Sequence, residues 1–263
     1  MNEGISVVRS DAVRTAARVA VVVALVETIG HWAVAAGLGL GVDPLGLALV
    51  ALAIVVGRPA QSGSAAGLLV AGVLLGDWSG GVVAATAGFV STAVVVGLWP
   101  HEGANDDAGW GVWLLRYGLV ASTAVLGFAA TSAWVADIVG RAAFSVTVGR
   151  TLVTTLPLAL LGAPLVKVAA EQVPGTPQWS PSHPMTRRSR AVVVGTVLCW
   201  TVGGYVGSFL FRALGQAPPG AVGRRISPLV GTFVDLWGPQ GTYAQLLLGT
   251  MALAVLGVVF RRE

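Results

Sequence analysis

Apolar runs of roughly 18 to 25 residues recur along the whole chain, and they constrain the fold more than any other feature. A helix of about 20 residues crosses the hydrocarbon core of a bilayer and satisfies its own backbone hydrogen bonds there. Charged residues make up only 11% of the 263 residues, whereas a soluble domain carries about 25%. The sequence therefore predicts an all-α fold, a polytopic transmembrane helical bundle.

The formal net charge of +4 comes from arginines that flank the apolar runs and do not form one basic surface. The positive-inside rule accounts for this pattern, so the charge indicates a lipid bilayer, the cell membrane, and no nucleic-acid partner. The single cysteine, Cys199, lies in an apolar run and excludes an intramolecular disulfide.

We expect eight helices, with both termini cytoplasmic because most arginines then lie inside. We expect the first run to be retained, because Glu27 interrupts the apolar core that a cleaved signal peptide would need. Pro157 and Pro164 predict a kink in the sixth helix. By apolar pattern and caps, the helices span about 15–37, 44–57, 64–76, 82–98, 110–136, 141–170, 191–212 and 242–260.

The helices group as six plus two. Residues 1–170 form a six-helix membrane domain, 171–190 a Pro/Arg-rich cytoplasmic linker, and 191–263 a two-helix hairpin. Within the hairpin, the outer segment 214–240 holds an apolar piece, 226–237, that is too short to cross a bilayer straight. We expect that piece to be re-entrant or interfacial.

The first apolar run carries one narrow polar and small-residue stripe. At about 100° per residue, one helix face collects Ala16, Ala20, Ala24, Glu27 and His31. Alanines let another helix approach closely, and a carboxylate and an imidazole need a polar partner or cavity. This stripe is therefore predicted to meet protein, and the rest of the helix to meet lipid.

Polar residues gather in the outer half of the first six helices under this topology. Ionisable groups inside a bundle are costly unless they are paired or functional, so their convergence predicts a small-molecule site open to the exterior. The candidate ligand-binding residues are Glu27, His31, Asp77, Trp78, Trp134, Asp137, Arg141, Thr147, Arg150 and Thr154.

Each of these residues also has a purely structural interpretation. The tryptophans suit an interfacial belt, the aspartates suit helix termini, and Arg141 suits an outer anchor that snorkels. Arg150 lies more than two turns into its predicted helix, and its structural alternative is an ion pair with Glu27 or Asp137. Both interpretations remain open.

Catalytic and metal-binding motifs are not found. There is no HExxH, no paired His/Cys spacing, no GxSxG elbow and no phosphate-binding glycine loop. The sole lysine, Lys167, lies near a cytoplasmic helix end, so a mid-membrane retinal site is excluded as well. We expect no enzyme, no cofactor and no metal site.

Residues 12–170 resemble the substrate-binding S component of energy-coupling factor (ECF) transporters. The likeness is carried by the spacing Ala16-xxx-Ala20-xxx-Ala24, the stretch GSAAGLLVAGVLLGDWSGG at 63–81, and FSVTVGRTLVTTLPLALLGAPLVKVAAE at 144–171. The last two are similar to the glycine-rich hairpin and the long final helix of that family. Two departures are the extra C-terminal helices and Asn2, which stands where metal-type S components have histidine.

The resemblance implies a binder of a vitamin-like micronutrient, which is held in the outer half of the bundle. It also implies docking of a transmembrane T component at Ala16, Ala20 and Ala24, with separate ATPase subunits driving uptake. The alternative class is a membrane sensory or scaffold protein that docks a partner through small-residue faces without a ligand. One stripe would serve both partner and ligand if the alanines lie at a different depth in the membrane from Glu27 and His31, or if the helix bends at Gly30.

Overall fold

The computed structural model describes residues 2–35, 43–99, 109–172, 185–216 and 242–262. Within these ranges every element is a helix and there is no strand, so the predicted all-α class is confirmed. The helices are α1 (Asn2–Ala35), α2 (Leu45–Val56), α3 (Pro59–Leu74), α4 (Trp78–Leu98), α5 (Trp110–Ile138), α6 (Phe144–Leu161), α7 (Ala163–Gln172), α8 (Arg187–Gln216) and α10 (Thr242–Arg262).

The described helices are those of an integral membrane protein. Five of them, α4, α5, α6, α8 and α10, are long and apolar enough to cross a bilayer. The sixth apolar helix, α2, has 12 residues and a length of about 18 Å, so it is too short to do so. The predicted apolar piece 226–237 lies outside the described residues.

Several helix boundaries in the structure differ from the predicted ones. Helix α1 begins at Asn2, well before 15, and α3 begins at Pro59, so the expected loop 58–63 is its first turn. Proline suits the first turn because its missing N–H would have no partner there. The expected kinked helix 141–170 is two helices, α6 and α7, separated by Gly162.

Glycines with positive φ lie in short connections between helices, and two of them bear on the predicted boundaries. Gly57 (φ 75°) ends α2 only two residues before α3, and Gly140 (φ 69°) follows the end of α5. This left-handed region is readily accessible to glycine and costly for other residues. The turn after Gly140 places Arg141 outside α6, not at its start as predicted.

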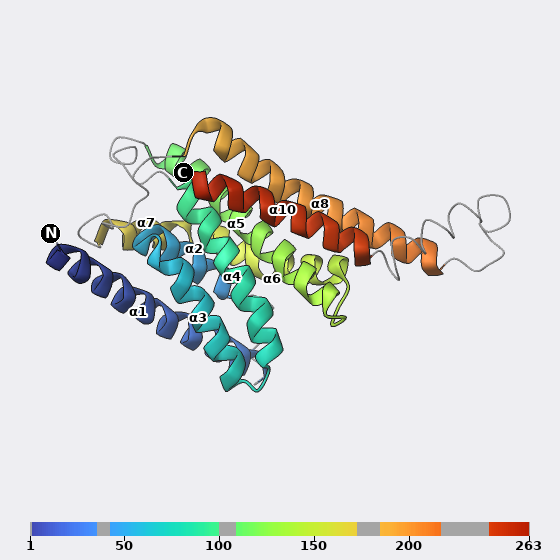
Figure 1. The fold of residues 1–263 in the computed structure, drawn as a ribbon, viewed down its shortest axis with the longest axis horizontal. Helices are drawn as coiled ribbons and strands as arrows, with labels where there is room; N and C mark the ends of the chain where they lie inside the picture. Colours follow the sequence, from blue (N-terminus) through green and yellow to red (C-terminus); the bar gives the residue numbers. More distant parts are fainter. Residues whose placement is uncertain (1, 36–42, 100–108, 173–184, 217–241, 263) are drawn as a thin grey trace.

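Helix α5 lies at the centre of the bundle (Figure 1). It packs against α4 and α6, and the antiparallel pair α8 and α10 covers another of its sides. Val193, Val197 and Leu256 of that pair belong to the same apolar core as α2, α4 and α5. The two C-terminal helices therefore share the core of the bundle.

Helix α1 packs on α3 through small residues. A side chain at Gly63 or Gly67 of α3 would collide with backbone oxygens of α1, at Ala16 and Ala20 respectively. Ala16 and Ala20 of the predicted stripe thus meet protein through their backbone, and that protein is α3 of the same chain, whereas His31 of the stripe is exposed. Val21, Leu25 and Ile29 on the other side are exposed, but Val19 and Val23, which were predicted to meet lipid, are buried against α3.

The bundle has one arginine-rich end. The start of α8 and the end of α10 meet there, because these helices are antiparallel and adjacent (Figure 1). Lys167 of α7 lies over the rings of Trp110 and Trp113, with centroids 5.1 and 5.7 Å from its Nζ. Tryptophan and lysine are typical of a membrane interface, so this cluster indicates where that end of the bundle would meet the membrane surface.

Candidate functional site

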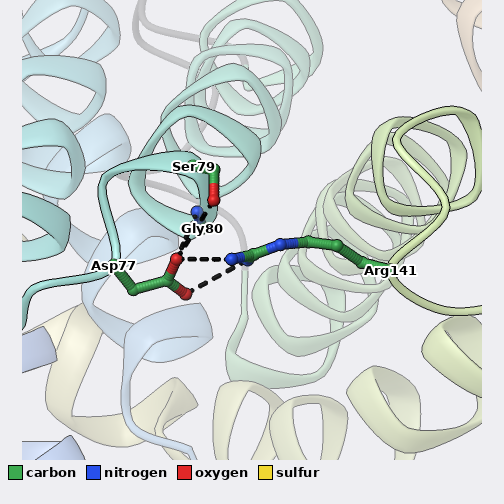
Figure 2. A network of polar contacts seen from close by, with 4 residues as sticks. All are labelled: Asp77, Ser79, Gly80 and Arg141. Carbon is green, nitrogen blue, oxygen red and sulfur yellow. Dashed lines mark hydrogen bonds and ion pairs between the residues drawn. The ribbon is translucent and has the colours of Figure 1, made fainter.

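Asp77 and Arg141 form an ion pair at the opposite end of the bundle (Figure 2). The guanidinium donates from Nη2 to Oδ1 at 2.5 Å and from Nη1 to Oδ2 at 3.1 Å, a bidentate arrangement. Oδ1 also accepts from the backbone N–H of Gly80 at 3.0 Å, which makes Asp77 the N-cap of α4.

This pairing sets the charge state of Asp77. The hydrogen bonds from Arg141 and Gly80 lower the pKa of the Asp77 carboxyl from its ordinary value of 3.8 to about 2. The two charges neutralise each other. The ion pair also connects the start of α4 with the turn between α5 and α6. Both predicted ligand residues are therefore already partnered within the chain. Trp78, the first residue of α4, points away from the core and is 70% exposed.

Trp134 belongs to a different part of the molecule. Its indole N–H donates to the backbone oxygen of Gln245 in α10 at 3.0 Å, and its ring packs edge-on against Trp200 of α8. Gly249 of α10 leaves the room that the ring needs. Trp134 therefore holds α8 and α10 onto α5, so the structure does not bring it together with the other candidate residues.

The threonine stripe of α6 is satisfied by its own helix. Thr147 donates to the Ala143 oxygen, and Thr154 donates to the Arg150 oxygen. Arg150 itself is exposed, and among the described residues it has no ion-pair partner. The ion pair with Glu27 or Asp137 that the sequence left open does not form.

Two half-buried carboxyls lie where α1 meets the start of α2. They are Glu27 of α1 and Asp43, which comes just before α2. Pro44, the next residue, lies 3.8 Å from the position that a side chain at Gly30 of α1 would take. Neither carboxyl has an ion-pair partner among the described residues, and His31, one turn beyond Glu27, is exposed.

The short α2 places Asp43 inside the bundle. The backbone N–H of Asp43 donates to the oxygen of Thr154, in the middle of α6, at 2.9 Å. Asp43 Oδ1 accepts from the N–H of Leu45 at 2.9 Å and so begins α2. The hydroxyl of Thr28, next to Glu27, is buried without a hydrogen-bond partner in this part of the chain.

The carboxylate cluster (Glu27, Thr28, Asp43) thus holds two half-buried acids without an ion-pair partner and one buried hydroxyl without a hydrogen-bond partner, among the described residues. Two acids without a cation need a proton, a positively charged ligand or water. The sequence predicted Glu27 as a candidate and did not predict Asp43. The available signal was the short apolar run 44–57, because a helix that cannot cross the membrane can place one of its ends within the bundle.

The remaining candidate residues do not add to this cluster. Asp137 is half-buried at the end of α5 and has an interaction of its own. No group of three or more His, Cys, Asp or Glu side chains within the described ranges could hold a metal ion. The ten predicted residues therefore do not form one constellation: Asp77 pairs with Arg141, Trp134 contacts α8 and α10, and Glu27 belongs to the carboxylate cluster.

Comparison with known proteins found no match to any family model, any curated protein or any solved structure.

Proposed function

We propose that this integral membrane protein binds a small solute, as S components of ECF transporters do, and that the carboxylate cluster recognises a positively charged group of that solute. The observation that carries the proposal is that Glu27 and Asp43, both half-buried where α1 meets the start of α2, have no ion-pair partner among the described residues. Unpaired, half-buried acids in a membrane bundle are costly, and membrane proteins keep such groups mainly where a solute or ion binds.

The chemistry of the site defines the solute class. An ammonium or another protonated nitrogen would neutralise the two carboxyls and offer a donor to the Thr28 hydroxyl oxygen. Arg150 lies one turn from Thr154, whose oxygen holds the backbone of Asp43. Its free guanidinium suits a carboxylate or phosphate on the same molecule. The proposed solute is therefore a mixed-charge, vitamin-like molecule.

The wider assembly is part of the same proposal. The protein resides in the cell membrane with its arginine-rich end and both termini in the cytoplasm, so the solute enters from the outside. A T component and ATPase subunits supply the energy. Because α3 already covers part of the alanine stripe, the T component contacts the exposed side of α1 and only the edge of the stripe.

Mass spectrometry of small molecules that co-purify with the protein tests the solute site. Glu27→Gln and Asp43→Asn each remove one charge with little change of shape, and we expect each to lower the retained solute at least about tenfold. Glu171→Gln is the matched control, because Glu171 is exposed and pairs with Lys167 on α7. Equal retention in all three variants would contradict the site assignment.

The alternative function, a scaffold without ligand, makes the opposite prediction. No small molecule would co-purify, and a membrane protein other than a T component would cross-link to α1. The close packing of Gly63 and Gly67 on Ala16 and Ala20 limits this face equally for a scaffold partner and for a T component, so the co-purification experiment decides between the two functions.

A further inference from the structure

An apolar groove runs between α8 and α10 on the outside of the bundle. Its volume is about 370 Å³, within the range of ~300–1,000 Å³ that small-molecule sites occupy. Residues three and four apart on each helix line it, among them Val192, Gly195 and Cys199 of α8 and Leu248, Met251 and Val255 of α10. Both helices are long and apolar enough to cross a bilayer, so the groove opens toward lipid chains.

The groove has the length of one leaflet. From Val192 to Trp200 the lining of α8 extends over about 12 Å, and half of a hydrocarbon core is about 15 Å thick. Gly195 provides much of the open space, since a side chain there would meet nothing within 4 Å. Trp200, which is fully buried, closes the inner end.

Arginines surround the other end of the groove. Arg187, Arg188 and Arg190 begin α8, and Arg261 and Arg262 end α10, which runs antiparallel beside it (Figure 1). Arg188 lies four residues before Val192 and seven before Gly195, so it continues the face of α8 that lines the groove, and its side chain is exposed. An apolar groove about as long as one leaflet is thick, with arginines at one end, can hold one acyl chain of a lipid and its anionic headgroup.

We infer that this groove binds an anionic phospholipid of the surrounding bilayer, with an acyl chain between α8 and α10 and the phosphate among the arginines. Arg188 donates to the phosphate through its exposed guanidinium, a charge-assisted hydrogen bond. The inference is independent of the solute site, because none of its residues contacts the carboxylate cluster.

Native mass spectrometry of the full chain tests the inference. The protein is released from detergent that contains equal amounts of phosphatidylglycerol and phosphatidylcholine. We expect a preference for phosphatidylglycerol that falls by about fivefold for each groove-facing arginine lost, as in Arg188→Gln. Arg18→Gln, on exposed α1, should leave the preference unchanged.

A second pair of variants tests whether the chain lies in the groove. Gly195→Leu fills the groove, whereas Gly257→Leu adds the same side chain to an equally open position of α10 that does not line it. We expect only Gly195→Leu to lose the bound lipid. Equal retention in the two variants would overturn the inference, as would lipid-independent dimers that Gly195→Leu converts to monomers.

Cys199 offers a test without substitution, because it is the chain's only cysteine and lines the groove. We expect phosphatidylglycerol to slow maleimide labelling of Cys199 several-fold more than phosphatidylcholine does. Equal protection by both lipids, or full protection by glycerol phosphate without a chain, would contradict the proposed occupant.

Discussion

Asp77 combines two stabilising contacts in one side chain. Its carboxylate caps α4 through the Gly80 N–H and pairs with Arg141 across to the next turn. These contacts are separable, because asparagine also caps a helix but carries no charge. We expect Asp77→Asn to lower the thermal unfolding temperature slightly at pH 7, and Asp77→Ala to cost about 1 kcal/mol more through the lost cap.

The effect of pH on this pair has a definite direction. The pKa of Asp77 is lowered on folding to about 2, so its ion pair stabilises the protein fully above pH 4 and is lost as pH falls toward 2. The difference in unfolding temperature between the wild type and Asp77→Asn should therefore shrink over that interval. A difference that is constant from pH 6 to 2 would contradict the assigned pKa.

Among the helices, the contact of α1 with α3 depends on missing side chains. The Cβ of an alanine at Gly67 would lie 2.5 Å from the Ala20 oxygen, so the two helices would have to separate. We expect Gly67→Ala to destabilise the bundle by about 1–3 kcal/mol, measured by thermal unfolding in detergent. Gly118→Ala on α5 meets nothing within 4 Å and should instead stabilise by roughly 0.5–1 kcal/mol.

The contact of α8 and α10 with α5 depends on one aromatic hydrogen bond. Trp134→Phe keeps most of the ring packing against Trp200 but removes the donor to the Gln245 oxygen. We expect a loss of about 1 kcal/mol in the free energy of unfolding. Trp78→Phe, at a side chain that is 70% exposed, should change it by less than about 0.5 kcal/mol.

At the scale of the whole bundle, the prediction concerns orientation in the membrane, with both termini expected in the cytoplasm. In a Cys199→Ser background, Ala142→Cys places a thiol in the turn between α5 and α6, and Ala169→Cys places one on α7 at the arginine-rich end. We expect an impermeant maleimide to label the first in intact cells and the second only after permeabilisation. The reverse result would place both termini outside.

Much of the bundle was predictable because hydropathy is a local property. The run 110–136 predicted α5 to within two residues, and the run 82–98 predicted the end of α4 at Leu98. The predictions failed where a boundary depended on packing, as at Gly162, which interrupts the predicted sixth helix where it meets Leu47 of α2.

The candidate site was predicted as a single group, and the structure divides it. Depth along each helix can be read from the sequence, but the direction that a side chain faces depends on helix rotation and tilt. Trp134 and Asp77 both lie near one end of the bundle, and yet one faces α10 and the other faces Arg141. Residues at equal depth need not meet.

The sequence by itself determined that this is a helical membrane protein with small-residue faces and polar groups within its helices, because length, hydropathy and residue size act locally. The tertiary structure decided which of those groups are satisfied. Asp77 forms an ion pair with Arg141, and α3 packs on the alanine stripe of α1. Glu27 and Asp43 have no ion-pair partner among the described residues. These outcomes depend on how helices far apart in the sequence pack against each other, and no local pattern specifies that.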